Sequence, residues 1–168
     1  FSRMKSVLPF LYTIMSSGRL RLPNSAIVVP ITFLPGERSE IGNFTSGGTE
    51  ADNLAILGTL AANPTRRHIV ISAVEHAAVF TLGEKLAAEG YRVSLAPVDT
   101  NGVLDCAAME KLIDADTALV SVMLANNETG VIMDAARAAM LAHAAGAVLL
   151  VDAVQTIGKM PVDVGAIG

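Results

Sequence analysis

The chain has 168 residues, of which 52% are hydrophobic, and it carries a formal net charge of -4 and a single cysteine. This length and hydrophobic content fit one domain with a buried core, and the acidic balance, without a basic cluster interleaved with aromatic residues, argues against nucleic acid as a partner. The lone Cys106 excludes an internal disulfide framework and a multi-cysteine metal site, so we expect no metal and a reducing, cytoplasmic compartment.

Residues 1–43 differ from the rest of the chain, and we interpret them as an atypical N-terminal segment. The run MKSVLPFLYTIMSS begins with a charge and continues with a short apolar stretch, as a signal peptide does, but no small-residue cleavage site clearly follows. No apolar run reaches the roughly 18 residues that a membrane span needs, so we expect no membrane association. The chain begins with Phe1 and ends at Gly168 inside a continuing pattern, which favours a fragment.

A pair of glycines opens the first clear helical pattern, in the stretch FTSGGTEADNLAI at residues 44–56. Apolar positions recur at helical spacing from Thr49 onward, so residues 46–49 are predicted to form the turn before a helix. Taken alone, the stretch favours a capped turn with Ser46 or Thr49 as the N-cap. The alternative is an anion site, because free amide groups at a helix start, bare glycine backbone and a threonine hydroxyl can together hold a phosphate.

Helical and strand-like patterns alternate along the rest of the chain. The predicted helices run from Glu50 to Ala61, Ala77 to Glu89, Ala107 to Asp114 and Asp134 to Ala145, and the predicted strands are HIVIS, YRVSLA, ALVSVML and AVLLV. Gly90 and Gly146 stand where helix C-caps belong, and Asp105 precedes its helix as an N-cap does. Because two of the strands are almost continuously apolar, the predicted fold class is α/β, with a mostly parallel sheet flanked by helices.

Polar residues follow three of the predicted strands at the point where each strand ends. They are Glu75 and His76 after the first, residues 126–130 (NNETG) after the third, and Asp152 with Gln155 after the fourth. Each has an ordinary alternative as a helix cap, a turn residue or a solvated side chain. Ligands of open α/β sheets bind beyond the carboxyl ends of the strands, however, so these groups could converge on one ligand. Together with the helix start they suit a flat cofactor with a phosphate and a ring nitrogen, such as pyridoxal phosphate.

Four motifs in this order point to a family. The stretches FTSGGTEADNLAI, SAVEHAAV, VSVMLANNETGVI and VDAVQTIGKMPVDV resemble successive motifs of the class V aminotransferases of fold-type I, specifically their cysteine desulfurases. The resemblance covers about residues 44–163. It implies that residues 44–168 are part of the large, pyridoxal-phosphate-binding α/β domain of such an enzyme, truncated before the Schiff-base lysine.

The resemblance also implies roles for individual residues. Gly48 and Thr49 would bind the cofactor phosphate, since glycine lets the backbone approach an anion. His76 would stack on the ring and assist proton transfer, as a catalytic residue. Asp152 would pair with the ring nitrogen and keep it protonated, so that the ring accepts electrons.

Two amide side chains complete the implied site. Asn127 and Gln155 would donate hydrogen bonds near the phenolic oxygen of the cofactor. The NNETG form resembles the desulfurase branch that serves iron-sulfur cluster assembly. In the family a lysine binds the cofactor covalently and a cysteine accepts sulfur, and both lie beyond the motifs present here. Cys106 does not match that cysteine and is interpreted as structural, and no match to the family lysine exists among Lys5, Lys85, Lys111 and Lys159.

The sequence therefore predicts part of a cysteine desulfurase, which converts L-cysteine to L-alanine and passes sulfur to an acceptor protein. The family resemblance implies a homodimer for the intact enzyme. Another class V aminotransferase or a selenocysteine lyase is the alternative within the family, and a non-catalytic α/β binding or interaction protein is the alternative outside it. Residues 1–43 lack the asparagine-alanine-threonine motif of the family. Without the lysine and cysteine, we expect this chain alone to bind the cofactor weakly and to release no sulfide.

Overall fold

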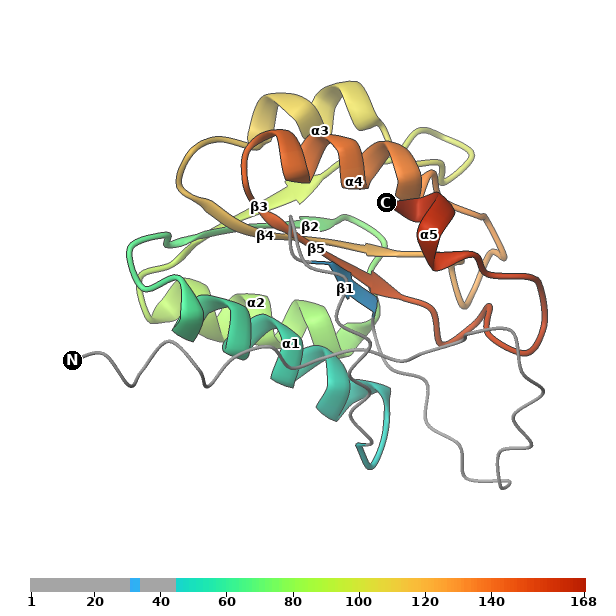
Figure 1. The fold of residues 1–168 in the computed structure, drawn as a ribbon, viewed down its shortest axis with the longest axis horizontal. Helices are drawn as coiled ribbons and strands as arrows, with labels where there is room; N and C mark the ends of the chain where they lie inside the picture. The colour runs from blue at the N-terminus through green and yellow to red at the C-terminus, as the bar shows by residue number, and fades with distance from the viewer. Residues whose placement is uncertain (1–30, 34–44) are drawn as a thin grey trace.

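The computed structural model of the chain describes residues 31–33 and 45–168 (Figure 1). Most of the segment 1–43 therefore lies outside the described residues, as does Phe44. In chain order the elements are β1 (Ile31–Phe33), α1 (Gly48–Ala62), β2 (His68–Ser72), α2 (Ala77–Ala88), β3 (Arg92–Ala96), α3 (Cys106–Leu112), β4 (Thr117–Met123), α4 (Ala135–Ala144), β5 (Val148–Asp152) and α5 (Val164–Ile167).

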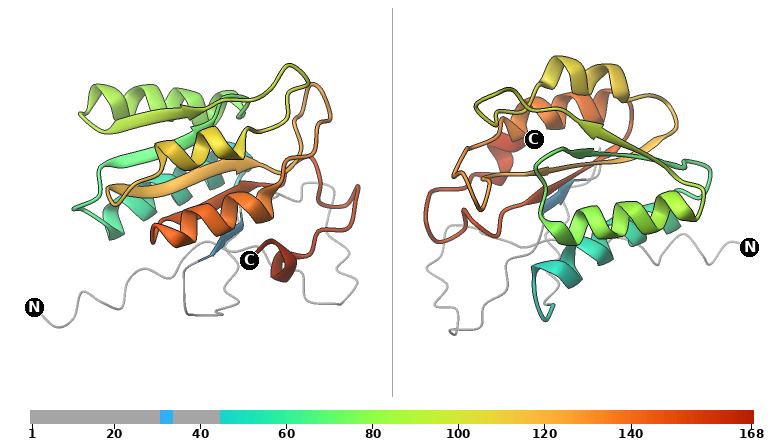
Figure 2. Two further views of the ribbon diagram at one scale, coloured as in Figure 1. Left: turned by 90° about the horizontal axis from the view of Figure 1, so that it is seen from above. Right: turned by 180° about the vertical axis from the view of Figure 1, so that it is seen from behind.

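The strands form one five-stranded sheet in the order β1-β5-β4-β2-β3. Strands β3, β2, β4 and β5 are parallel to one another, and only β1 is antiparallel, beside β5. Helices α1 and α2 cover one face of the sheet, and α3 and α4 cover the other (Figures 1 and 2). The predicted α/β class with a mostly parallel, helix-flanked sheet is confirmed.

Two apolar cores fill the spaces between the sheet and its helix layers. Successive side chains of a strand point to opposite faces, so Val70 of β2 and Leu149 of β5 enter one core, while Ile69 and Leu150 enter the other. Every residue of β2, β4 and β5 is buried, which explains the continuous apolar runs in their sequence. Within the described residues, no helix is both long and apolar enough to cross a membrane.

The predicted element boundaries hold to within two residues, and the caps predicted at Asp105, Gly90 and Gly146 have the expected geometry. The Ala108 amide donates to Asp105 Oδ1 at 2.9 Å, so Asp105 is the N-cap of α3. Gly90 and Gly146 follow α2 and α4 with φ angles of 86° and 68°, a left-handed conformation that glycine adopts without strain. The sequence patterns do not predict β1 or α5, which have three and four residues.

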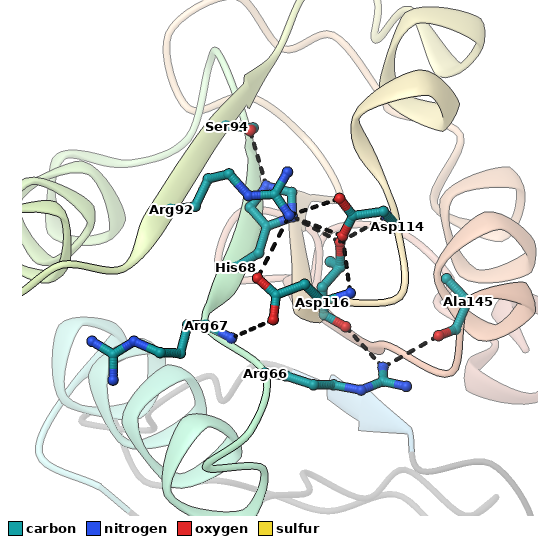
Figure 3. Close-up of polar contacts among 9 residues, drawn as sticks. Arg66, Arg67, His68, Arg92, Ser94, Asp114, Asp116 and Ala145 are labelled. Atoms are coloured by element: carbon teal, nitrogen blue, oxygen red, sulfur yellow. Dashed lines mark hydrogen bonds and ion pairs between the residues drawn. The ribbon is translucent and has the colours of Figure 1, made fainter.

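A polar network closes the edge of the sheet at which the parallel strands begin (Figure 3). His68 is fully buried there, and its two ring nitrogens lie 2.8 Å from Thr117 Oγ1 and 2.9 Å from Ser94 Oγ. Arg92 and Asp114 form a salt bridge of 2.7 Å at its exposed side. The amino edge of the sheet is therefore occupied by its own side chains, and the polar residues predicted to bind a ligand lie at the opposite, carboxyl edge.

Candidate functional site

The candidate site lies at the carboxyl edge of the sheet, where the parallel strands end. The chain runs from β2 through α2 to β3, then returns through α3 to β4 on the other side of β2. Helices α2 and α4 lie on opposite faces of the sheet (Figure 2), so the chain leaves β2 and β4 towards opposite sides, and such a switch point is the usual ligand position in open α/β sheets. His76 follows β2, Asn127 follows β4, and Asp152 ends β5.

Helix α1 begins at the same edge with several free backbone donors. Its N-cap is Gly47, which has no side chain, and not Ser46 or Thr49 as the sequence predicted for a capped turn. The Ser46 hydroxyl is already used, because both its amide and its Oγ donate to Glu50 Oε2, at 2.6 and 2.7 Å. These bonds hold the pKa of Glu50 below its usual range. The amides of residues 48–50 meet no acceptor among the described residues, which is the arrangement that binds an anion.

Gly48 brings the start of α1 against the segment after β5. A Cβ atom added to Gly48 would lie 3.0 Å from Val154 Cγ2, whereas one added to Gly47 would meet nothing within 4 Å. The two glycines thus differ in what they allow. Gly48 permits close helix packing, and Gly47 leaves open space beside the free amides. Thr49, the second predicted phosphate ligand, is exposed in the first turn of α1.

Asp152 is the last residue of β5 and is 6% exposed. Its Oδ1 accepts a hydrogen bond from the Val154 amide at 2.9 Å, and its Oδ2 accepts none from the part of the chain that the structure describes. Burial raises the pKa of Asp152, while the Val154 amide and the nearby His76 lower it. One carboxylate oxygen is therefore held in place and the other is available to a cationic ligand group.

His76 is exposed and serves as the N-cap of α2. Its Nδ1 accepts a hydrogen bond from the Ala78 amide at 3.1 Å. This nitrogen therefore has the helix-capping role that the sequence offered as the ordinary alternative. Because Nδ1 is an acceptor, the neutral ring carries its proton on Nε2. The cap orients the ring and leaves Nε2 free for a second interaction.

The two predicted amide donors differ in their surroundings. Asn127 is exposed in the turn after β4, and that turn is organised by Asn126, whose Oδ1 accepts from the Glu128 and Thr129 amides at 2.9 and 2.8 Å. Gln155 is half-buried, and its Oε1 accepts from Lys159 Nζ at 2.6 Å. The amide nitrogen of Gln155 therefore remains a donor.

Two further carboxyl groups, Glu75 and Asp52, are buried at this edge, and the sequence patterns give neither of them a role. Glu75, noted only as following β2, accepts from Ser72 Oγ at 2.7 Å, Met123 N at 2.6 Å and Ser121 Oγ at 3.2 Å, and burial raises its pKa to about 7. Asp52 in α1 is 2% exposed, and its Oδ1 has no hydrogen-bond partner among the described residues. Burial, then the charges of Asp152 and Glu75, raises the pKa of Asp52 to about 8.

A sequence signal for Asp52 existed. It lies among the small and apolar residues of its own helix that face the core, Ala51, Ala55 and Ile56, where an unpaired carboxyl group is unusual. Cys106 is half-buried at the start of α3, and burial raises the pKa of its thiol. A raised thiol pKa is typical of an unreactive cysteine, in line with the structural role expected for it.

The chain is similar to known proteins along most of its length. A profile described as aminotransferase class-V matches residues 33–168. Over 134 residues the chain is 47% identical to cysteine desulfurase 2 of Trichormus variabilis, covering 79% of this chain and 33% of that protein. It spans about a third of the length of the curated relatives that it matches.

Solved structures share the fold. A NifS-like protein superposes with a TM-score of 0.67 at 35% identity, covering 71% of this chain and 34% of that one. SspA in complex with cysteine superposes with a TM-score of 0.65 at 27% identity, covering 71% of this chain and 35% of that one. The architecture described above is thus that of part of a larger, known fold.

Proposed function

The chain belongs to the class-V aminotransferase family, and from that premise we propose that the whole protein is a pyridoxal-phosphate-dependent cysteine desulfurase. It would convert L-cysteine to L-alanine and pass the sulfur to an acceptor protein. The observation that carries the proposal is the buried Asp152 carboxylate at the end of β5, on the carboxyl edge of the sheet and within electrostatic reach of His76.

The residues at the carboxyl edge fit pyridoxal phosphate in their chemistry. The free amides at the start of α1 suit a phosphate, for which Gly48 and Thr49 would be the ligands. Asp152 offers an acceptor to a protonated ring nitrogen, and the exposed imidazole of His76 offers a flat face to an aromatic ring. When bound, pyridoxal phosphate supplies an electron sink for bonds at the α-carbon of an amino acid.

Each of these side chains has a defined task in the proposed enzyme. An ionised Asp152 favours the protonated form of the ring nitrogen, because an opposite charge at close range stabilises the cation. His76 holds its mobile proton at Nε2, since Nδ1 is engaged by the Ala78 amide. Asn127 and Gln155 would donate to the phenolic oxygen of the cofactor, and the free amide nitrogen of Gln155 is suited to this.

The names of the relatives favour desulfurase chemistry over the transaminase and selenocysteine lyase alternatives. One relative is named a cysteine desulfurase, and SspA was solved in complex with cysteine. We therefore propose L-cysteine as the substrate and iron-sulfur cluster assembly as the destination of the sulfur. A homodimer, a separate sulfur acceptor and a cytoplasmic location complete the proposal.

The test compares the whole wild-type protein with Asp152→Asn. We expect the wild type to bind pyridoxal phosphate, detected by its visible absorbance, and to release sulfide from L-cysteine. Asp152→Asn is expected to keep the far-ultraviolet circular dichroism of the fold and to lose sulfide release by about 100-fold or more. Asp105→Asn is the matched control, because asparagine also caps helices and Asp105 lies at the start of α3. Near-normal sulfide release by Asp152→Asn, or no cofactor binding by the wild type, would contradict the proposal.

A further inference from the structure

Three buried carboxyl groups lie towards the carboxyl edge of the sheet, one from each of three segments. Asp52 comes from α1, Glu75 from the loop after β2, and Asp152 from the end of β5, and they are 2%, 6% and 6% exposed. We call these three residues the carboxyl trio. They act on one another, because the charges of Asp152 and Glu75 raise the pKa of Asp52, and the charge of Asp152 raises that of Glu75.

The carboxyl trio cannot be fully ionised in this environment at low cost. Burying a carboxylate without a partner is strongly unfavourable, and like charges at close range add to the penalty. No Lys or Arg side chain in the described ranges forms a salt bridge with any member of the trio, and no group of three or more His, Cys, Asp and Glu residues there is placed to hold a metal ion. The remaining way to reduce the charge is a proton on one member.

Hydrogen-bond donors decide which member holds that proton. Glu75 accepts from two hydroxyl groups and one amide, and donors of this kind stabilise the ionised form. Asp152 accepts from the Val154 amide and lies near His76. Asp52 Oδ1 is buried and receives no donor from the described residues, so ionisation of Asp52 is the least compensated of the three.

We propose that Asp52 is a positioning residue that holds the shared proton of the carboxyl trio and thereby leaves Asp152 ionised for the ring nitrogen of the cofactor. The identity of that ligand rests on the proposed function. Asp52 is an addition to it, because Asp52 is not among the residues proposed to contact pyridoxal phosphate. A neutral Asp52 leaves two negative charges, rather than three, in the carboxyl trio.

This arrangement links cofactor binding to the proton on Asp52. A cationic ring nitrogen beside Asp152 would offset the negative charge of Asp152, which raises the pKa of Asp52 in the cofactor-free protein. The pKa of Asp52 should therefore fall when the cofactor binds, and Asp52 should lose its proton more readily. The charges that act on Asp52 are those of Asp152 and Glu75, and His76 at the start of α2 acts on Asp152. The ionisable residues within α2, Glu84 and Lys85, are exposed. Strand β4, which also packs against α1, contributes no ionisable side chain, since its sequence is TALVSVM.

The first measurement locates the proton in the whole, cofactor-free protein. Carbon-13 NMR of labelled aspartate carboxyl groups is followed as a function of pH in the wild type, Asp52→Asn and the control Asp105→Asn. We expect one aspartate to titrate at about 8 in the wild type and in the control, and this titration to be missing in Asp52→Asn. Should Asp52→Asn fold poorly, Asp152→Asn replaces it, because removal of that charge should move the same titration to lower pH.

The second measurement tests the link to the cofactor. Titration calorimetry with pyridoxal phosphate at pH about 8, in buffers of different ionisation enthalpy, counts the protons released on binding. Compared with Asp105→Asn, we expect Asp52→Asn to release fewer protons by up to about half a proton, since Asp52 is half protonated near its pKa.

The outcomes separate the two proposals. Aspartates that all titrate in the ordinary acidic range, or a high titration that persists in Asp52→Asn, would overturn the assignment of the proton. Equal proton release by Asp52→Asn and the control would overturn the link to the ring site. A protein that binds no pyridoxal phosphate would contradict the proposed function, and the NMR titration would still decide whether Asp52 holds the proton.

Discussion

Gly48 and Val154 are in direct contact across the start of α1 and the segment after β5, so close that a Cβ on Gly48 would lie 3.0 Å from Val154 Cγ2. Gly48→Ala must therefore displace one of the two segments. We expect it to lower the free energy of unfolding by about 1–3 kcal/mol, measured by urea denaturation.

Gly47→Ala is the matched control for this substitution. Gly47 has a φ of 177°, an extended conformation open to any residue, and an added Cβ would meet nothing within 4 Å. It should change stability by less than about 1 kcal/mol. In the Gly48→Ala background, Val154→Ala should restore part of the lost stability. If Gly48→Ala is not destabilising and Val154→Ala restores nothing, the contact with Val154 does not restrict the side chain at position 48.

The pH dependence of stability should report the proton on Asp52. Its pKa is raised from 3.8 to about 8, so the folded state binds this proton more tightly than the unfolded state between these values. The contribution of Asp52 is therefore present at acidic pH and is lost as pH rises towards 8, by up to about 1.4 kcal/mol per pH unit. Urea denaturation at a series of pH values should show a smaller fall with pH for Asp52→Asn than for the wild type.

Other groups contribute to the same pH profile, which is why the comparison uses a variant. Burial also raises the pKa of Glu75, so Glu75 adds to the fall in stability as the pH rises. Burial and then Arg92 lower the pKa of His68, so His68 lowers the stability of the fold at acidic pH. The contribution of His68 is shared by wild type and variant, whereas that of Glu75 is coupled to Asp52 and belongs to the difference between them. A profile that is identical in Asp52→Asn and the wild type would count against a raised pKa at Asp52.

The sequence was sufficient for the parallel sheet because its strands are local, apolar and covered on both faces. The runs HIVIS and AVLLV became β2 and β5 with boundaries within one residue. Strand β1 could not be predicted in this way, because its three residues pair with β5, more than a hundred positions away, and carry no pattern of their own. Its antiparallel position depends on tertiary contacts.

The candidate site was predictable in part for a similar reason. Asp152 and His76 stand immediately after strands, so the strand ends point to them. Asp52 lies inside a helix, and part of the rise in its pKa comes from the charges of Asp152 and Glu75. These residues are distant in sequence and come near Asp52 only in the folded chain. The N-cap was mispredicted because the Glu50 carboxylate competes for Ser46, a contact that residue preferences do not encode.

The network at the opposite edge of the sheet should be sensitive to loss of a single hydroxyl group. Thr117 Oγ1 lies 2.8 Å from His68 Nδ1 and accepts from the Asp114 amide at 2.9 Å. Thr117→Val keeps the shape but leaves the buried His68 nitrogen without this partner, so we expect a loss of about 1–3 kcal/mol in urea denaturation. Thr81→Val, on the exposed side of α2, is the control and should change little. Equal stability of the two variants would show that the buried hydrogen bond contributes nothing net.

Neighbouring asparagines in the turn after β4 should separate a structural role from a binding role. Asn126 Nδ2 donates to the Val74 carbonyl at 3.1 Å, and its Oδ1 accepts from two turn amides, so it joins the loops after β2 and β4. Asn126→Ala removes these three bonds together with those to Met123 Sδ and from Thr129 Oγ1, and we expect it to lower the free energy of unfolding by about 2–4 kcal/mol. Asn127 is exposed and forms no side-chain hydrogen bond with the described residues, so Asn127→Ala should leave stability unchanged to within about 0.5 kcal/mol. If Asn127 donates to the phenolic oxygen as proposed, the same variant of the whole protein should shift the visible absorbance maximum of bound pyridoxal phosphate. A stable Asn127→Ala protein with an unaltered cofactor spectrum would remove Asn127 from the site, because the turn does not need its side chain.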